Sequence, residues 1–327
     1  MNIKITPIAL PSPTPGFSLQ QFYARYGILA ALIALCIFLS FSNQYFMSWG
    51  NWADILRQTS INGILAIGMT FVVLTAGIDL SVGAILAFAG MVSAWLVAGD
   101  STYGLTMSLL VGLGVGALLG AVNGLLVARL SVPPFVASLG MLSAARGLTY
   151  IYNDGMPVSD LPDDFLAIGA GHVWQVPVPI LIFVAVIAIS WFVLRYTIYG
   201  RYIYAVGGNS KSAKTSGIST RKVLFAVYVV SGFLAALAGI LLAARTTAAL
   251  PQAGVSYELD AIAAVVIGGT SLSGGTGSLG GTVVGALLIG VINNGLNLLG
   301  VSSYYQQVIK GVIIVGAVLL DVSRKKQ

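Results

Sequence analysis

Long apolar segments follow one another through this chain and constrain its fold more than any other feature. Of its residues, 57% are hydrophobic and only 8% are charged. A soluble domain has about 25% charged residues, so this chain has too little polar surface to cover a water-exposed core. Because a helix needs roughly 20 apolar residues to cross a bilayer, we predict an all-α polytopic membrane protein with about ten transmembrane helices. The predicted spans centre on Ile28–Phe46, Ile61–Thr75, Val82–Ala98, Leu105–Val127, Pro134–Tyr152, Val178–Leu194, Val223–Ala244, Leu259–Thr270, Leu279–Leu299 and Tyr305–Leu320.

The distribution of basic residues predicts how the chain is oriented. Lys and Arg gather in residues 195–222 and at the C-terminus, whereas residues 153–175 contain four Asp and no Lys or Arg. Cytoplasmic loops carry the excess of Lys and Arg, so both termini and the 195–222 loop are predicted to be cytoplasmic. We therefore expect a disordered cytoplasmic tail (1–26), a transmembrane domain (27–322) and a basic cytoplasmic tail (323–327).

Two parts of the chain resemble each other. "VGALLGAVNGLLVA" at 115–128 resembles "VGALLIGVINNGLNLLG" at 284–300. Each is preceded by an apolar helix that opens with a carboxylate, at Asp79 in the first case and at Glu258 and Asp260 in the second. The predicted orientation turns the two parts opposite ways, which is typical of the inverted repeats of transporters. The repeat halves would be about 50–152 and 223–322.

Asp79 is the one carboxylate of the apolar stretch "LTAGIDLSVGAILAF". One interpretation is structural: near a helix N-terminus, a carboxylate satisfies free N–H groups and the helix dipole. Gly77 and Gly83 would then allow a tight start and close packing. The other interpretation is functional, because ionisable residues within a membrane often line the path of a polar solute. The sequence leaves both interpretations open.

Neutral polar residues are the other candidates for such a path. Asn and Ser can bind hydroxyl groups without selecting a charge, which suits a sugar better than an ion. A proton-coupled carrier typically has paired ionisable residues deep in the membrane, and we expect no such pair here. For any one Asn, the alternative is a helix–helix hydrogen bond worth roughly 0.6 kcal/mol. The candidate path residues are Asp79, Ser81, Asn123, Asn293, Asn294 and Asn297. The series Gly112, Gly116, Gly120 and Gly124 has GxxxG spacing and predicts a helix-packing stripe.

The basic 195–222 loop contains signals for a short helix. Asn209 is a good N-cap and Gly217 a good helix stop, with Lys211 and Lys214 exposed between them. A two-turn helix over Ser210–Ser216 would be unstable in isolation, so we expect it to pack on something. It is either part of an ordinary basic loop or a docking helix for a soluble partner.

The sequence excludes several other functions. It has no GxxxxGK[ST] motif, and the Gly-rich segment 268–281 lacks a Lys, so no ATP site is predicted. Cys36 and His172 are the only residues of their kinds, so the sequence contains no Cys/His metal-ligand spacing, and no Ser/His/Asp or Cys/His nucleophile set can be assembled. No basic face with interleaved aromatic residues is present to bind nucleic acid. We expect neither catalysis nor a cofactor.

Three segments carry a resemblance to a known family. They are "TAGIDLSVG" at 75–83, "GRYIYAVGGNSKSAKTSGI" at 200–218 and "YELDAIAAVVIGGTSLSGGTGSLGGTVVGALLIGVINNGLNLLGVSSYYQ" at 257–306. These segments resemble the membrane permeases of bacterial ribose ABC importers, whose wider family serves ribose, xylose, arabinose, galactose and autoinducer-2. The resemblance runs from about Asn43 to the C-terminus, and the 257–306 segment is most similar to the ribose members.

The resemblance implies a ten-span importer fold in the bacterial inner membrane. Two permease chains, expected to be identical, would form the pore, and a periplasmic binding protein would deliver the sugar. A cytoplasmic ATP-binding protein would dock on the helix at 210–216. The positions implied to couple the pore to this partner are Gly207, Asn209, Ser210, Ala213, Lys214, Gly217 and Ile218.

Three alternatives remain at this point. The chain could be an ion-coupled secondary sugar carrier, although the absence of a predicted charge pair disfavours this. It could belong to an ABC importer of branched-chain amino acids, which would lack "GIDLSVG" and need groups for a zwitterion. It could be a membrane scaffold, which would leave the repeat unexplained.

Overall fold

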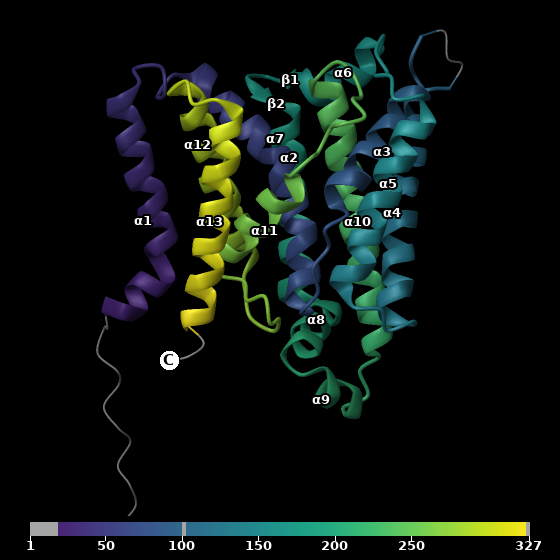
Figure 1. Cartoon of the computed structure of the whole chain (residues 1–327), viewed down its shortest axis with the longest axis vertical. Coiled ribbons are helices and arrows are strands. Elements are labelled where there is room, and N and C mark those ends of the chain that lie inside the picture. Colours follow the sequence, from purple (N-terminus) through teal and green to yellow (C-terminus); the bar gives the residue numbers. More distant parts are fainter. Residues whose placement is uncertain (1–18, 100–102, 325–327) are drawn as a thin grey trace, which may run out of the picture.

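The computed structural model describes residues 19–99 and 103–324, and nearly all of this part of the chain is helical. Figure 1 shows the long helices side by side, with α6 and a small β-hairpin at one end and α8 and α9 at the other. The helices are α1 (Leu19–Ser42), α2 (Trp49–Leu74), α3 (Val82–Trp95), α4 (Leu105–Ala128), α5 (Pro134–Tyr152), α6 (Asp163–Ala170), α7 (Val178–Tyr196), α8 (Ile198–Gly208), α9 (Ser210–Thr215), α10 (Thr220–Arg245), α11 (Tyr257–Ile267), α12 (Leu279–Leu298) and α13 (Ser303–Arg324). The hairpin pairs β1 (His172–Val173) with β2 (Val176–Pro177) in antiparallel register.

Each of the ten predicted spans coincides with a helix, namely α1 to α5, α7 and α10 to α13. Within the described part of the chain, five helices are long and apolar enough to cross a membrane alone: α2, α4, α7, α10 and α12. With 14 and 11 residues, α3 and α11 are too short, since a helix rises 1.5 Å per residue. The all-helical membrane architecture is therefore confirmed, whereas ten crossings and the inverted repeat stay predictions.

One predicted boundary is wrong. Helix α1 begins at Leu19, so residues 19–26 of the expected disordered tail are helical. The last proline of the N-terminal segment is Pro15. The following segment "LQQFYARY", residues 19–26, contains neither Pro nor Gly, which are the residues that disfavour a helix. The rest of the predicted tail, residues 1–18, lies outside the described residues, as do residues 325–327 of the C-terminal tail.

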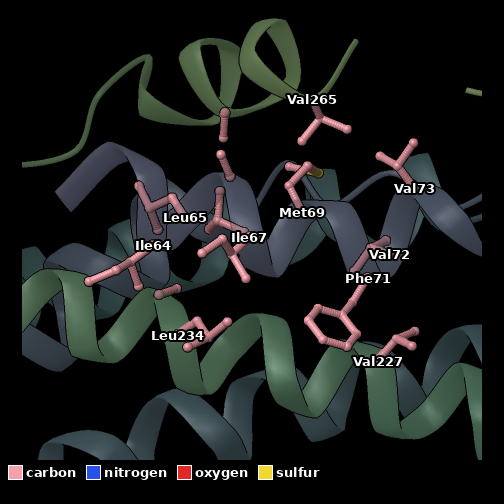
Figure 2. Packing of buried hydrophobic residues seen from close by; sticks show 14 of the residues in the cluster. Ile64, Leu65, Ile67, Met69, Phe71, Val72, Val73, Val227, Leu234 and Val265 are labelled. Carbon is pink, nitrogen blue, oxygen red and sulfur yellow. The ribbon is translucent and has the colours of Figure 1, made fainter. Parts of the chain in front are cut away.

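The core is built around α2, whose residues 59–74 are all buried. Figure 2 shows side chains of α2, such as Ile64 and Phe71, packed between Leu234 and Val227 of α10 on one side and Val265 of α11 on the other. Apolar side chains gain no hydrophobic free energy by moving from lipid into the protein interior, so a helix that is buried on all sides is held by close packing against its neighbours. Helix α2 therefore lies at the centre of the packing with α7, α10, α11 and α12.

The predicted glycine stripe of α4 packs against α10. A Cβ at Gly116 or Gly120 would overlap Ala236 or the Tyr228 carbonyl, and one at Gly124 would lie 2.8 Å from the Phe225 carbonyl. Small residues let two helix backbones approach this closely. The GxxxG prediction is confirmed, and α4 and α10 pack closely against each other along this stripe.

Candidate functional site

Asp79 lies in the unwound segment between α2 and α3 and is fully buried. Its Oδ1 accepts hydrogen bonds from the Ser81 backbone N–H at 3.1 Å and from the Ser81 hydroxyl at 2.5 Å. Its Oδ2 accepts a hydrogen bond from the Ser231 hydroxyl of α10 at 2.8 Å. Asn123 of α4 donates from Nδ2 to Ser81 Oγ at 2.9 Å. The structure thus brings three predicted path residues together and occupies both carboxyl oxygens of Asp79 with protein donors.

The backbone beside Asp79 is held by close packing. Ala76 has a positive φ of 62°, which reverses the chain at the end of α2. A Cβ at Gly77 would lie 2.8 Å from the Tyr228 hydroxyl, so a larger residue does not fit there. The Ile78 carbonyl accepts hydrogen bonds from the Ser138 hydroxyl at 3.2 Å and from the Tyr228 hydroxyl at 3.5 Å. Helices α5 and α10 therefore fix this turn together with the Asp79 carboxyl group.

The starts of the two short helices lie against each other. A Cβ at Gly83 in α3 would overlap the Gly254 carbonyl and lie 2.5 Å from Glu258 Oε2. Gly254 belongs to the loop before α11 and has a φ of 69°, which favours glycine. The predicted helix-opening residues Gly83 and Glu258 therefore meet inside the molecule, although 175 residues separate them along the chain. The role of glycine at position 83 is close backbone approach, as the sequence predicts.

The loop before α11 is anchored by charged residues that the sequence analysis did not pair. Arg146 of α5 donates from Nη1 to the carbonyls of Pro251 and Ala253 at 2.7 and 2.8 Å. Asp260, which is 3% exposed, forms an ion pair with Lys310 of α13 at 2.9 Å. The expectation that the spans hold no charge pair is therefore wrong. Fifty residues separate these partners on different helices, so no local spacing indicates that they meet.

The three asparagines of α12 do not join Asp79. Figure 1 places α12 and α4 on opposite sides of α2 and α10. Asn294 donates from Nδ2 to Asn51 Oδ1 of α2 at 2.8 Å, and Gln306 of α13 donates to Asn297 Oδ1 at the same distance. These two asparagines connect helices, which is the structural alternative that the sequence left open.

Asn293 and Asn294 both have a buried amide oxygen that no described residue donates to. Asn293 is the more buried of the two, at 4% exposure. Asn62 Oδ1 and Thr59 Oγ1 of α2 likewise have no hydrogen-bond partner within the described residues, at 7% and 1% exposure. A Cβ at Gly290, one turn before Asn293, would overlap Thr59 Oγ1, so α2 and α12 touch at this level. The contact between α2 and α12 therefore contains several buried acceptors that the protein itself does not use.

Helix α9 has the predicted local geometry. Asn209 Oδ1 accepts a hydrogen bond from the Ser212 backbone N–H at 2.9 Å, and Gly217 has a φ of 84°. Asn209 is therefore the N-cap, and Gly217 ends the helix in a conformation that L side chains rarely adopt. Of the other predicted coupling residues, Ser210 and Lys214 are exposed, Ala213 is buried and Ile218 is half-buried.

Glycines connect the helix before α9 to the end of α2. A Cβ at Gly207 of α8 would overlap the Leu74 carbonyl, the last residue of α2. That carbonyl also accepts a hydrogen bond at 2.9 Å from the backbone N–H of Gly275, in the loop between α11 and α12. A Cβ at Gly274 would lie 2.7 Å from the Ala76 N–H. Helix α8 therefore contacts the end of α2 and the loop between α11 and α12 through backbone atoms, with no space for a side chain between them.

Residues 51–318 match a family model described as "Branched-chain amino acid transport system / permease component". The matched range includes Asp79, the contact between α2 and α12, and α9. The chain belongs to this permease family.

Relatives of this permease are similar along almost their whole length. The ribose import permease protein RbsC of Haemophilus influenzae is 48% identical over 316 residues, covering 95% of this chain and 97% of the relative. The D-allose transport system permease protein AlsC of Escherichia coli is 43% identical, covering 93% and 94%. The probable ABC transporter permease protein YphD of Escherichia coli is 41% identical, covering 96% of each chain. No solved structure matches the chain.

The sequence analysis did not identify some residues of the Asp79 network and of the contact between α2 and α12. Ser231 is one of several small polar residues in an apolar helix, and nothing in its local sequence indicates a partner 152 residues away. Thr59 likewise shows no pattern that separates it from an ordinary helix-packing residue. Asn62 was visible only as a polar residue inside a span. Buried polar atoms of this kind become recognisable once the packing shows which of them have partners.

Proposed function

We propose that this permease is the membrane subunit of an ATP-binding-cassette importer. It forms the translocation pathway for a sugar, and ribose is the substrate that the similarity to its relatives supports best. The observation that carries this proposal is the 48% identity to a ribose import permease over 95% of the chain. The family description names branched-chain amino acids, but the three relatives named above include carriers of ribose and allose. Xylose, galactose, arabinose and autoinducer-2 are the alternative substrates.

The proposal includes ten membrane crossings built as an inverted repeat in the bacterial inner membrane, with both termini cytoplasmic. The opposed short helices α3 and α11 support this arrangement, because each begins at the Gly83–Gly254 contact and they end at opposite sides. After α3, the Gly99 N–H donates to the Asp160 carbonyl near α6. After α11, the Gly277 carbonyl accepts a hydrogen bond from the Tyr204 hydroxyl of α8. Broken helices around a central site are typical of transporters.

Within this pathway we assign the sugar contact to the unused acceptors between α2 and α12, above all Asn293 and Asn62. A sugar hydroxyl can donate to a buried amide oxygen that has no protein donor. Asp79 is assigned to the framework, because both of its carboxyl oxygens already accept hydrogen bonds. Asn297 is assigned to a helix contact for the same reason, since its Oδ1 already accepts from Gln306. Asn294 makes a helix contact through its Nδ2, and its own Oδ1 is a further unused acceptor.

The expected partners are a second copy of this chain, a cytoplasmic ATP-binding protein seated on α9 and a periplasmic sugar-binding protein. The direct test expresses the permease with these proteins in bacteria that lack ribose uptake. Radiolabelled ribose should enter the cells, and unlabelled ribose should compete better than allose or xylose. Purification of the tagged chain should bring a stoichiometric ATP-binding protein with it. Uptake without any such protein would overturn the proposal.

The Lys310–Asp260 ion pair favours a second candidate, an ion-coupled secondary sugar carrier, because such carriers use paired charges within the membrane. The two candidates differ in their energy source. Collapse of the ion gradients at constant ATP should leave uptake unchanged for the importer and abolish it for the carrier.

Coupling through α9 can be tested at its glycine stop. Gly217→Val places a β-branched residue at a φ of 84°, so the end of α9 must change shape. We expect a normal amount of permease in the membrane, normal ATP hydrolysis by the partner and ribose uptake reduced at least about tenfold. Gly208→Val is the matched control, because its added side chain meets open space. Normal uptake by the Gly217→Val variant would contradict the coupling role of α9.

A further inference from the structure

A cavity of about 450 Å³ lies between the end of α4 and the start of α10. Its polar lining is strongly basic, with Arg129 on α4 and Arg221 and Lys222 on α10, all three of them exposed. Ion pairs in the described part of the chain involve only Arg57 and Lys310, so none of these three cations is neutralised by a carboxylate there. The cavity therefore concentrates positive charge that the protein leaves uncompensated.

The position of two of these cations adds to the imbalance. Arg221 and Lys222 lie in the first turn of α10, where the helix dipole is positive and carboxylates, not cations, are stabilising. Ser219 occupies the N-cap position without making a side-chain cap hydrogen bond. Bound phosphate would offset both the side-chain charges and the free N–H groups of this turn.

The remaining lining is apolar and continues along the membrane-facing surface. Leu125 and Phe225 line the cavity beside the cations. Leu125, Val122 and Leu118 are exposed at helical spacing on α4, and they lead from the cavity toward the middle of the helix. Gly124 of α4 packs closely against Phe225 of α10, so the two helices leave no gap on that side of the cavity. A ligand that fits this surface has an anionic head and a long apolar tail.

We propose that this cavity is a binding site for an anionic phospholipid, with the phosphate between Arg129, Arg221 and Lys222 and an acyl chain along the α4 stripe. Basic pockets between transmembrane helices on the cytoplasmic side bind anionic lipid headgroups in this way. The assignment to the cytoplasmic leaflet rests on the orientation proposed above. The lipid site itself depends neither on the transported sugar nor on the ATP-binding protein.

The test measures lipid binding to the purified full chain by native mass spectrometry in mild detergent. The probes are phosphatidylglycerol and phosphatidylcholine with identical acyl chains. The variant R129Q/R221Q/K222Q is compared with R201Q/K211Q/K214Q, which removes three exposed cations from α8 and α9 at the same end of the molecule. Each cation near an anionic headgroup is worth roughly fivefold in affinity, so the first variant should bind phosphatidylglycerol on the order of 100-fold less tightly. The second variant should bind it as the unaltered chain does, and each single substitution in the cavity should show about a fivefold loss.

Three results would overturn the proposal. Equal affinity of the unaltered chain for the two lipids would show that the cavity does not recognise the charge. Displacement of phosphatidylglycerol by millimolar inorganic phosphate would assign the cations to a free anion instead of a lipid. If the cavity variant kept its preference for phosphatidylglycerol but lost a co-purifying ATP-binding protein, the basic surface would belong to a protein interface. Failure of ribose uptake in cells would leave this lipid measurement unaffected, so the two proposals can fail separately.

Discussion

The Asp79 network and the polar contact between α2 and α12 are both buried among apolar helices, but they differ in how their polar groups are satisfied. Asp79 accepts hydrogen bonds from three protein donors, and Asn123 donates to Ser81 of the same cluster, although Asn123 Oδ1 has no donor among the described residues. Between α2 and α12, Asn293 and Asn62 have amide oxygens that no described residue donates to.

We propose that this difference separates the residues that stabilise the permease from those that contact its substrate. A satisfied buried network stabilises the fold, and its loss leaves several groups without partners at once. An unpaired buried acceptor costs free energy, so its removal does not weaken the fold, and its retention points to a ligand. Substitutions in the first region should therefore change stability most, and substitutions in the second should change uptake most.

The largest effect is expected from Asp79→Leu. It removes the acceptor for the Ser81 and Ser231 hydroxyls and for the Ser81 N–H, and each unpaired buried donor costs roughly 1–3 kcal/mol. We expect a loss of about 3 kcal/mol in unfolding free energy, which should appear as a sharply reduced midpoint of thermal unfolding in detergent and little folded protein in membranes. Asp79→Asn should cost about 1 kcal/mol, because the amide oxygen still accepts from the Ser81 N–H and its NH₂ can donate to Ser231.

The Asp79 pair of variants also tests the comparison itself. Both variants could have the same midpoint of thermal unfolding as the unaltered permease and yet show no uptake. In that case the charge at this position would act on the substrate. The division between framework and path would then be wrong.

A smaller effect is expected from Ser231→Ala, which removes one of the three donors to Asp79. One lost hydrogen bond within a membrane protein is worth roughly 0.6–1.7 kcal/mol. The unfolding midpoint should fall by a few degrees while the affinity for ribose stays the same. Ser143→Ala is the control, because that exposed hydroxyl bonds only to Leu139 of its own helix. An unchanged midpoint for Ser231→Ala, or a changed affinity for ribose, would show that the serine does not serve the framework.

Local features of both regions could be read from the sequence, whereas their partners could not. The Asn209 cap, the Gly217 stop and the glycine stripe of α4 depend on neighbours within one or two helical turns, and the structure has all three. The bonds from Ser231 to Asp79 and from Asn294 to Asn51 join residues 152 and 243 positions apart. Such pairs depend on which helices pack together, and apolar helices of similar composition do not encode their neighbours in a readable pattern.

The smallest effect on stability is expected from Asn293→Leu and Asn62→Leu. Each replaces an amide whose oxygen has no protein donor by an apolar side chain of similar volume, so the midpoint of thermal unfolding should stay constant or rise. The sugar would lose an acceptor worth roughly 0.5–1.5 kcal/mol, so the KM for ribose uptake should rise about threefold to tenfold. Asn297→Leu is the matched control on the same helix, because Asn297 is exposed and bonded to Gln306. If Asn293→Leu destabilised the permease and Asn297→Leu changed uptake more, the unused acceptors would belong to the framework after all, and the path would have to be sought elsewhere on α2.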